Sequence, residues 1–73
     1  MAQTYPVVFQ AREDYPGNPG WWRYSRPIAR RASVAQLDRW FASEEYRYTA
    51  WHSMAAARRD AGRQQAEWRA SYA

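Results

Sequence analysis

The strongest structural signal in the chain is the segment SVAQLDRWFASEEYRYTAWHSMAAARRDA, residues 33–61. At 100° per residue, most of its large apolar side chains fall on one stripe of a helix. That stripe comprises Val34, Leu37, Trp40, Phe41, Tyr48, Trp51, His52 and Ala55. The opposite face comprises Arg39, Ser43, Tyr46, Ser53, Ala57 and Asp60. The spacing therefore predicts one long helix over about 33–61.

Signals at the ends of this segment support a helix. Ser33 and Gln36 have capping-box spacing ahead of the apolar run. Glu44 interrupts the apolar stripe, which leaves a break near that residue as an alternative. Gly62 is a stop signal, and residues 63–70 would then form a short terminal helix. Within the long helix, the phase predicts that Leu37, Phe41, Trp51 and Ala55 are buried together, while Arg39, Tyr46 and Asp60 face solvent or a partner.

The residues before Pro27 differ in composition from the rest of the chain, because they hold three of the four prolines and two of the three glycines. Residues 4–10 are rich in β-formers, but Pro6 limits them to an edge strand or an extended arm. Residues 14–20 contain Pro-Gly and Asn-Pro turn signals. Residues 21–26 then suit a second strand, which would make a loose hairpin with the first.

Together these segments predict an α+β fold that is mostly α. Its N-terminal third, residues 1–26, is extended or a β-hairpin and packs on one long helix plus a short C-terminal helix. The helical part spans 27–73, with Pro27 in a first-turn position. We interpret residues 1–73 as a single small domain, since this length suffices for one compact core.

The core of such a domain has to be built from aromatic side chains. The chain has thirteen aromatic residues, five of them Trp, and few large aliphatic ones. A fold of this size cannot enclose thirteen rings, and Tyr and Trp are the residues that anchor interfaces. We therefore expect several of the rings to remain at the surface.

The net charge of +4 comes from eleven Arg, no Lys and seven acidic residues. Arg stacks on rings and pairs bidentately with carboxylates or phosphates, although GC-rich codon usage accounts for the missing Lys equally well. Acidic and basic residues are interspersed rather than gathered into a basic stripe. This distribution favours a protein partner and keeps a nucleic acid as an alternative.

Several classes of protein are disfavoured by what the sequence lacks. Without Cys, disulfides and thiolate metal sites are excluded. No signal peptide and no apolar run of membrane-spanning length is present, so we expect no membrane partner and a cytoplasmic or virion location. The single histidine, His52, lies about 10 Å along the predicted helix from Glu45. We therefore expect no catalysis, no cofactor and no metal.

Two short resemblances point to nucleic-acid binding. Residues 28–37 resemble the opening of a helix-turn-helix, but Arg39 stands where the second helix needs an apolar residue. Residues 22–26 resemble the ribbon of ribbon-helix-helix proteins, whose Gly-containing turn between two helices is missing here. The Arg and aromatic residues of 21–26 also have the composition that stacks on unpaired bases.

The function predicted from the sequence is stoichiometric binding to a larger protein or nucleoprotein assembly, as an accessory subunit, a phage-like virion component or an inhibitor. The alternative is a small nucleic-acid-binding protein, and self-association is also open. The predicted partner-binding residues are Trp21, Trp22, Arg23, Tyr24, Arg26, Arg39 and Tyr46. Because adjacent strand residues point to opposite faces, we expect one of Trp21 and Trp22 to enter the core and the other to stay exposed. Burial of both rings is the competing expectation.

Overall fold

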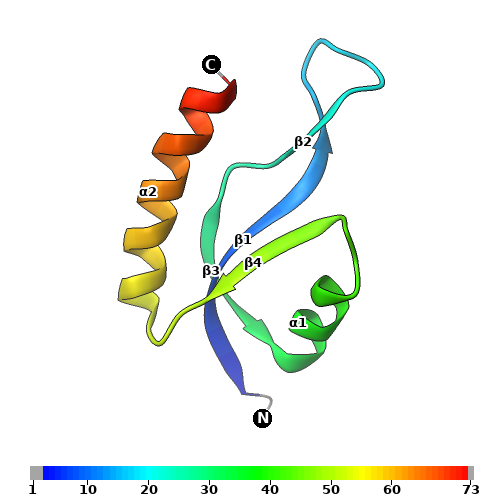
Figure 1. Cartoon of the computed structure of the whole chain (residues 1–73). Helices are drawn as coiled ribbons and strands as arrows, with labels where there is room; N and C mark the ends of the chain where they lie inside the picture. The colour runs from blue at the N-terminus through cyan, green and yellow to red at the C-terminus, as the bar shows by residue number, and fades with distance from the viewer. Residues whose placement is uncertain (1–2, 73) are drawn as a thin grey trace.

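The computed structural model describes residues 3–72, which form four strands and two helices (Figure 1). In chain order these are β1 (Thr4–Asp14), β2 (Trp22–Tyr24), β3 (Ile28–Ser33), α1 (Val34–Phe41), β4 (Tyr46–Ala50) and α2 (Met54–Tyr72). The four strands make an antiparallel sheet in which β1 pairs with each of the others. A hairpin forms as predicted, but β2 pairs with Arg12–Asp14 of a longer first strand and not with residues 4–10.

The fold is α+β, but the expectation that it is mostly α was wrong. Strands hold 36% of the described residues and helices about 39%. Two strands, β3 and β4, lie in the part that was predicted to be helical, and Pro27 is buried just before β3 instead of opening a helix. The β-rich part of the molecule therefore extends well beyond residue 26.

The single helix predicted over 33–61 is replaced by α1, β4 and α2. The break near Glu44 is confirmed, because α1 ends at Phe41 and the chain resumes as a strand at Tyr46. The physical reason is a period of two: the rings of Tyr46 and Tyr48 face α1, and Arg47 between them faces the other way. A strand buries both Tyr rings on one face, which a helix cannot do at this spacing.

Strand β1 lies inside the sheet, so the edge position predicted from Pro6 was wrong. Pro6 is tolerated because its carbonyl accepts a hydrogen bond from the Trp51 N–H at 2.9 Å. The N and C=O of a strand residue point to the same side, so the missing N–H of Pro6 faces Trp51, just beyond the end of β4. The hydrogen bond that Pro6 cannot donate therefore falls at the end of the β1–β4 ladder and not within it.

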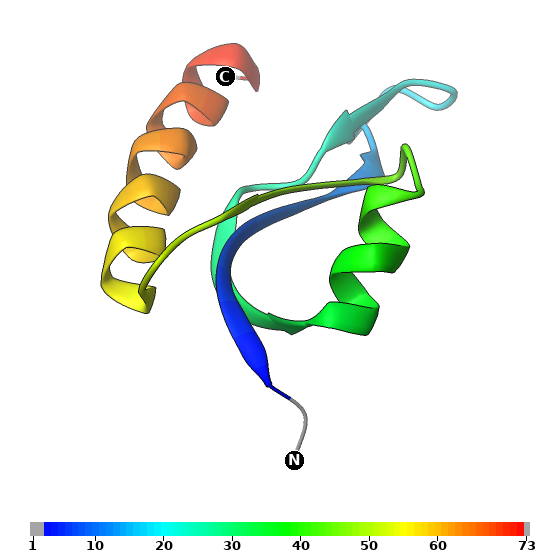
Figure 2. The same cartoon turned by 60° about the horizontal axis from the view of Figure 1, so that its bottom comes forward.

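The two helices pack on opposite faces of the sheet (Figure 2). On the α1 face, Val7, Ala32 and Trp40 are buried together, with four further side chains packed against them. On the α2 face, Val8 packs with Ala57 and Ala61 of the helix. The alternation of Val7 and Val8 along β1 thus supplies one aliphatic side chain to each half of the core.

Helix boundaries were predicted with mixed success. The Ser33–Gln36 capping box is confirmed at the start of α1. Gly62 does not end a helix, because it lies in the middle of α2, and residues 63–70 continue the same helix. Gly62 is exposed, and a side chain there would meet no atom within 4 Å.

Most burial predictions that depended on the long helix were wrong. Phe41 is 84% exposed and Ala55 is exposed, whereas Asp60 is only 7% exposed. Leu37 and Trp51 are partly buried, but on opposite faces of the sheet. Because α1, β4 and α2 replace the single helix, the predicted apolar stripe does not form. Each of the three elements buries its own set of side chains. Within residues 3–72, neither helix combines the length and apolarity needed to cross a bilayer.

Candidate binding surface

The end of the β1–β2 hairpin is held by turns whose backbone only glycine adopts easily. Gly17 and Gly20 have φ angles of 77° and 87°. Hydrogen bonds close the loop: the Tyr15 N–H donates to the Trp21 carbonyl at 2.9 Å, and the Trp21 N–H donates to the Asn18 carbonyl at 3.1 Å. Trp21 is therefore presented at the base of an ordered loop.

Both tryptophans of the hairpin are exposed, Trp21 by 71% and Trp22 by 46%. The expectation that one of them enters the core was wrong, and so was the competing expectation that both are buried. The reason is the length of β1, whose last residues pair only with β2. This end of the hairpin projects beyond the part of the sheet that α1 covers (Figure 1).

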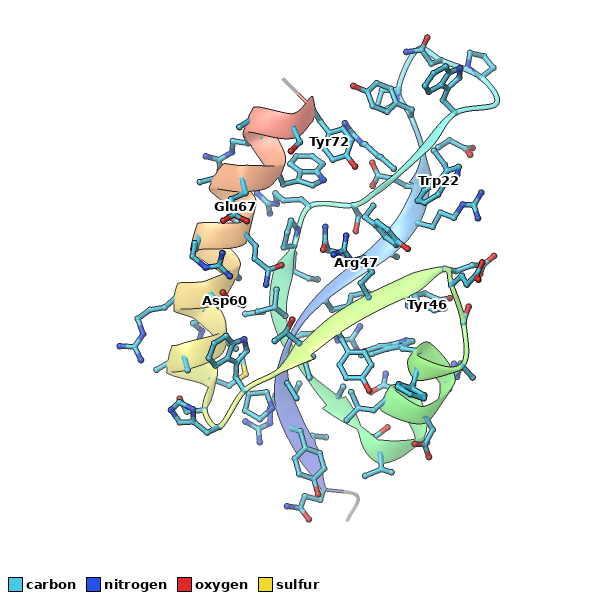
Figure 3. All side chains as sticks on the ribbon, viewed as in Figure 1. Trp22, Tyr46, Arg47, Asp60, Glu67 and Tyr72 are labelled. Carbon is cyan, nitrogen blue, oxygen red and sulfur yellow. The ribbon has the colours of Figure 1, made fainter. Side chains whose placement is uncertain are left out.

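Four side chains on the hairpin and β4 form a continuous stack, which we call the Arg–Trp–Tyr row. The guanidinium of Arg12 lies 4.2 Å from the centre of the Trp22 ring, and Trp22 meets Tyr24 edge-to-face at 5.3 Å. Arg47 completes the row from β4, 4.8 Å from the Tyr24 ring (Figure 3). Cation–π contacts of this kind orient side chains that would otherwise move freely.

Sequence reasoning missed Arg12 and Arg47. The predicted first strand ended at Gln10, so Arg12 fell between that strand and a predicted loop. Arg47 fell within the predicted long helix. An antiparallel register continued to Asp14 pairs Arg12 with Tyr24 and is the signal that would have found the first arginine. For Arg47 the signal is the alternation of aromatic and charged residues in Tyr46, Arg47 and Tyr48, which has the period of two of a strand.

Arg23, predicted as a partner-binding residue, points inward instead. Its Nε donates to the Glu13 carboxylate at 2.9 Å, and its side chain is only 14% exposed. The guanidinium also lies between three rings, 5.1 Å from Tyr15, 4.8 Å from Trp68 and 5.4 Å from Tyr72. We call this arrangement the Arg23 clasp, because it ties the hairpin to the end of α2.

Tyr24 links the row to the rest of the fold. Its hydroxyl donates to the Glu44 carbonyl at 3.1 Å, and its own carbonyl accepts from the Trp68 indole at 2.7 Å. A hollow of about 310 Å³ adjoins it between α2 and the strands. Arg47 and Glu67 both line this hollow, so it can accept polar groups of either charge.

The other predicted site residues lie in different surroundings. Arg26 is exposed two residues after Tyr24. Arg39 is exposed on α1, and Tyr46 is half-buried against Phe9, with ring centres 5.8 Å apart. The structure thus groups Trp21, Trp22 and Tyr24 but not Arg39 or Tyr46.

Charges of both signs surround the row. Arg12, Arg26 and Arg47 are exposed, and so are three carboxylates of the same region, those of Asp14, Glu44 and Glu45. Asp14 is the cross-strand neighbour of Trp22. The Glu45 carbonyl accepts from the Arg12 N–H at 2.7 Å, which places this acidic pair beside the row.

An electrostatic perturbation lies away from the hairpin, at Asp60 on α2. Burial alone would raise the pKa of its carboxyl group. Hydrogen bonds from Arg63 and Gln64 and the positive charge of Arg63 outweigh burial, so the pKa of Asp60 lies below its ordinary value. The Trp51 indole also donates to this carboxylate, at 3.1 Å, so Asp60 joins α2 to the end of β4.

Comparison with known protein families, curated proteins and solved structures finds no match to this chain. The function is therefore argued from the geometry of the hairpin.

Proposed function

We propose that this protein binds a larger protein or nucleoprotein assembly stoichiometrically and without catalysis, through the hairpin surface formed by Trp21, Trp22 and the Arg–Trp–Tyr row. The observation that carries the proposal is the exposure of two adjacent Trp rings, 71% and 46%, on an ordered hairpin. Trp, Tyr and Arg are the residues enriched at the centres of interfaces. A hairpin held by turns and the Arg23 clasp loses little conformational freedom on binding.

The balance of charge favours a protein contact over a phosphate backbone. Asp14 lies opposite Trp22 and Glu45 lies beside Arg12, both with exposed side chains, and these carboxylates would repel phosphates. A protein partner with mixed charges matches this pattern better.

Nucleic acid is the second candidate, because the row alternates cations with aromatic rings. Such an alternation suits single strands, whose bases stack on rings while arginines follow the backbone. Two of the arginines already stack on Trp22 and Tyr24. We therefore expect binding to single-stranded or duplex DNA to be non-specific and strongly salt-dependent, with Kd on the order of 10⁻⁴–10⁻⁶ M near physiological salt.

The test is capture of partners from extracts of the protein's own source cells with the tagged full-length chain. The double variant Trp21→Ala/Trp22→Ala is compared with Phe41→Ala, which removes an exposed ring from α1 instead. We expect one protein to be captured in stoichiometric amount by the wild type and by Phe41→Ala, with loss of capture by the double variant. Nuclease treatment of the extract should leave this result unchanged.

Equal capture by the double variant and the wild type contradicts a role for the hairpin. Capture that disappears after nuclease treatment supports the nucleic-acid alternative. So does specific binding of an oligonucleotide at about 10⁻⁸ M or tighter in an anisotropy titration, the usual range for specific complexes.

A further inference from the structure

Strand β4 has an outer edge that no other strand within residues 3–72 pairs with. Arg12 donates its N–H to the Glu45 carbonyl and Trp51 donates its N–H to the Pro6 carbonyl, so the odd-numbered residues of this segment face β1. Backbone groups of successive strand residues alternate in direction. The N–H and C=O of Tyr46, Tyr48 and Ala50 therefore point away from β1, and no hydrogen bond within residues 3–72 reaches them.

The other open edge, that of β3, is protected by its own side chains. The outward carbonyl of Arg31 accepts from the Arg30 Nε at 3.2 Å, and the outward N–H of Ser33 donates to the Gln36 side chain at 2.9 Å. Helix α2 packs beside β3 as well. Charged side chains and covering elements are the usual protection of an edge against pairing. Strand β4 carries one charged residue, Arg47, but among the described residues no side chain bonds to the outward backbone groups of Tyr46, Tyr48 and Ala50.

The hydrophobic core is small for a chain that must fold alone. The buried apolar residues are Val7, Val8, Ala32, Trp40, Ala56, Ala57 and Ala61. Four of these seven are alanines, whereas Val34 and Phe41 of α1 are 52% and 84% exposed. Domains below about 70–80 residues gain stability from disulfides, metals or oligomerisation, and this chain has no cysteine.

We propose that the protein forms a symmetric dimer in which β4 pairs antiparallel with β4 of a second copy, centred on Tyr48. Each Tyr48 N–H then donates to the Tyr48 carbonyl of the other copy, and the two four-stranded sheets become one. A two-fold axis requires a self-complementary contact, and pairing about Tyr48 satisfies that requirement with the outward backbone groups that the fold leaves free.

The side chains of β4 are compatible with this register. Arg47 lies opposite Thr49 of the second copy, so two like charges never face each other across the seam. On the other face, Tyr46 lies opposite the small Ala50. Helix α1 packs against β4, and the two-fold axis places both copies of α1 on the same face of the joined sheet. The exposed Phe41 is therefore on the face where the second copy also has a helix.

Sedimentation equilibrium of the full-length chain, from micromolar to millimolar concentration, tests the dimer. We expect the mass to rise from 8.7 kDa towards twice that value. Thr49 is exposed, so Thr49→Arg and Thr49→Glu form a matched pair that leaves the core intact. Thr49→Arg places like charges opposite Arg47 at two symmetric positions and should weaken the dimer roughly 2- to 30-fold, while Thr49→Glu should tighten it by a similar factor.

Amide hydrogen exchange locates the seam without a substitution. The Tyr48 N–H should exchange more slowly as concentration rises through the dimer transition, while the outward Ala29 N–H of β3 should not change. A monomeric mass at every concentration overturns the proposal. A dimer equally stable in the two Thr49 variants, or one that leaves the Tyr48 amide unprotected, overturns it as well. Arg47 takes part in both proposals, but the hairpin proposal is tested by partner capture with variants of Trp21 and Trp22, so the two can fail independently.

Discussion

The Arg23 side chain makes its contacts within the protein, although nearby residues in the sequence are exposed Trp and Arg residues. Removing its side chain deletes the ion pair with Glu13 and the contacts with three rings. Hydrogen bonds between charged groups contribute about 1.5–3 kcal/mol, and cation–π contacts contribute about 0.5–2 kcal/mol depending on burial. These contacts join β1, β2 and α2, so their removal should destabilise the whole domain and not the hairpin alone.

We therefore predict that Arg23→Ala lowers the free energy of unfolding by about 2–3 kcal/mol in urea denaturation. The matched control is Arg26→Ala, which removes an exposed arginine three residues later and should change stability by no more than about 0.5 kcal/mol. If the two variants are equally stable, the Arg23 clasp does not exist in solution.

Asp60 gives stability a defined dependence on pH. Because the pKa of its carboxyl group is lowered in the folded protein, its contribution is fully present above the ordinary value of about 3.9. It is lost as the pH falls through the lower folded value. Asp60→Asn should therefore destabilise the protein at pH 6, and the difference from wild type in urea unfolding should shrink as the pH is lowered below the ordinary value of the carboxyl group. A difference that stays constant or grows in acid contradicts this assignment.

At the scale of elements, the sequence was informative wherever the signal is local. The Ser33–Gln36 capping box, the turn between β1 and β2, and the break near Glu44 all depend on neighbours in the chain, and each was predicted. The Glu67–Arg63 ion pair is local as well, with i,i+4 spacing on α2 and a distance of 2.8 Å. Arg47, three residues after Glu44, has its cation–π contact with Tyr24, a residue distant in the chain.

Strands β3 and β4 were missed because their stability comes from partners distant in the chain. Ile28–Ser33 contains two arginines and two alanines and has little strand propensity, yet it pairs along six residues of β1. Tyr46–Ala50 fits a helical stripe and a period of two equally well over so short a length. In both cases tertiary pairing decided the structure. The same limit applies to the candidate site, since Arg12 and Arg47 meet Tyr24 only after the strands pair.

Gly62 provides a test of the continuous helix α2. It lies within the helix, and a methyl group at this position would have no atom within 4 Å, so an alanine fits there without strain. Gly62→Ala should raise the free energy of unfolding by about 0.5–1 kcal/mol. Gly17→Ala should lower it, because the φ angle of Gly17 is 77°. If Gly62→Ala is destabilising, α2 does not run through this position.

At the scale of the whole molecule, the protein is more extended than its length requires. Its radius of gyration is 13.2 Å, and its principal extents are 42 × 25 × 15 Å. A compact chain of this length has a radius of gyration of about 11 Å. The hairpin accounts for part of this length, because it continues past the region that α1 covers (Figure 1). Projection of this kind carries Trp21 and Trp22 away from the core and makes them accessible to a partner.

The most direct measurement is the free energy of unfolding of Trp21→Ala and Trp22→Ala, made beside partner capture with the same preparations. Trp21→Ala should change stability by no more than about 0.5 kcal/mol. Trp22→Ala should cost about 1 kcal/mol, because it loses the stacking of Arg12. Both variants should lose the captured partner while remaining folded. A loss of about 3–5 kcal/mol in either variant, the cost of removing a buried aromatic ring, would show that the ring belongs to the core and contradict the proposed surface.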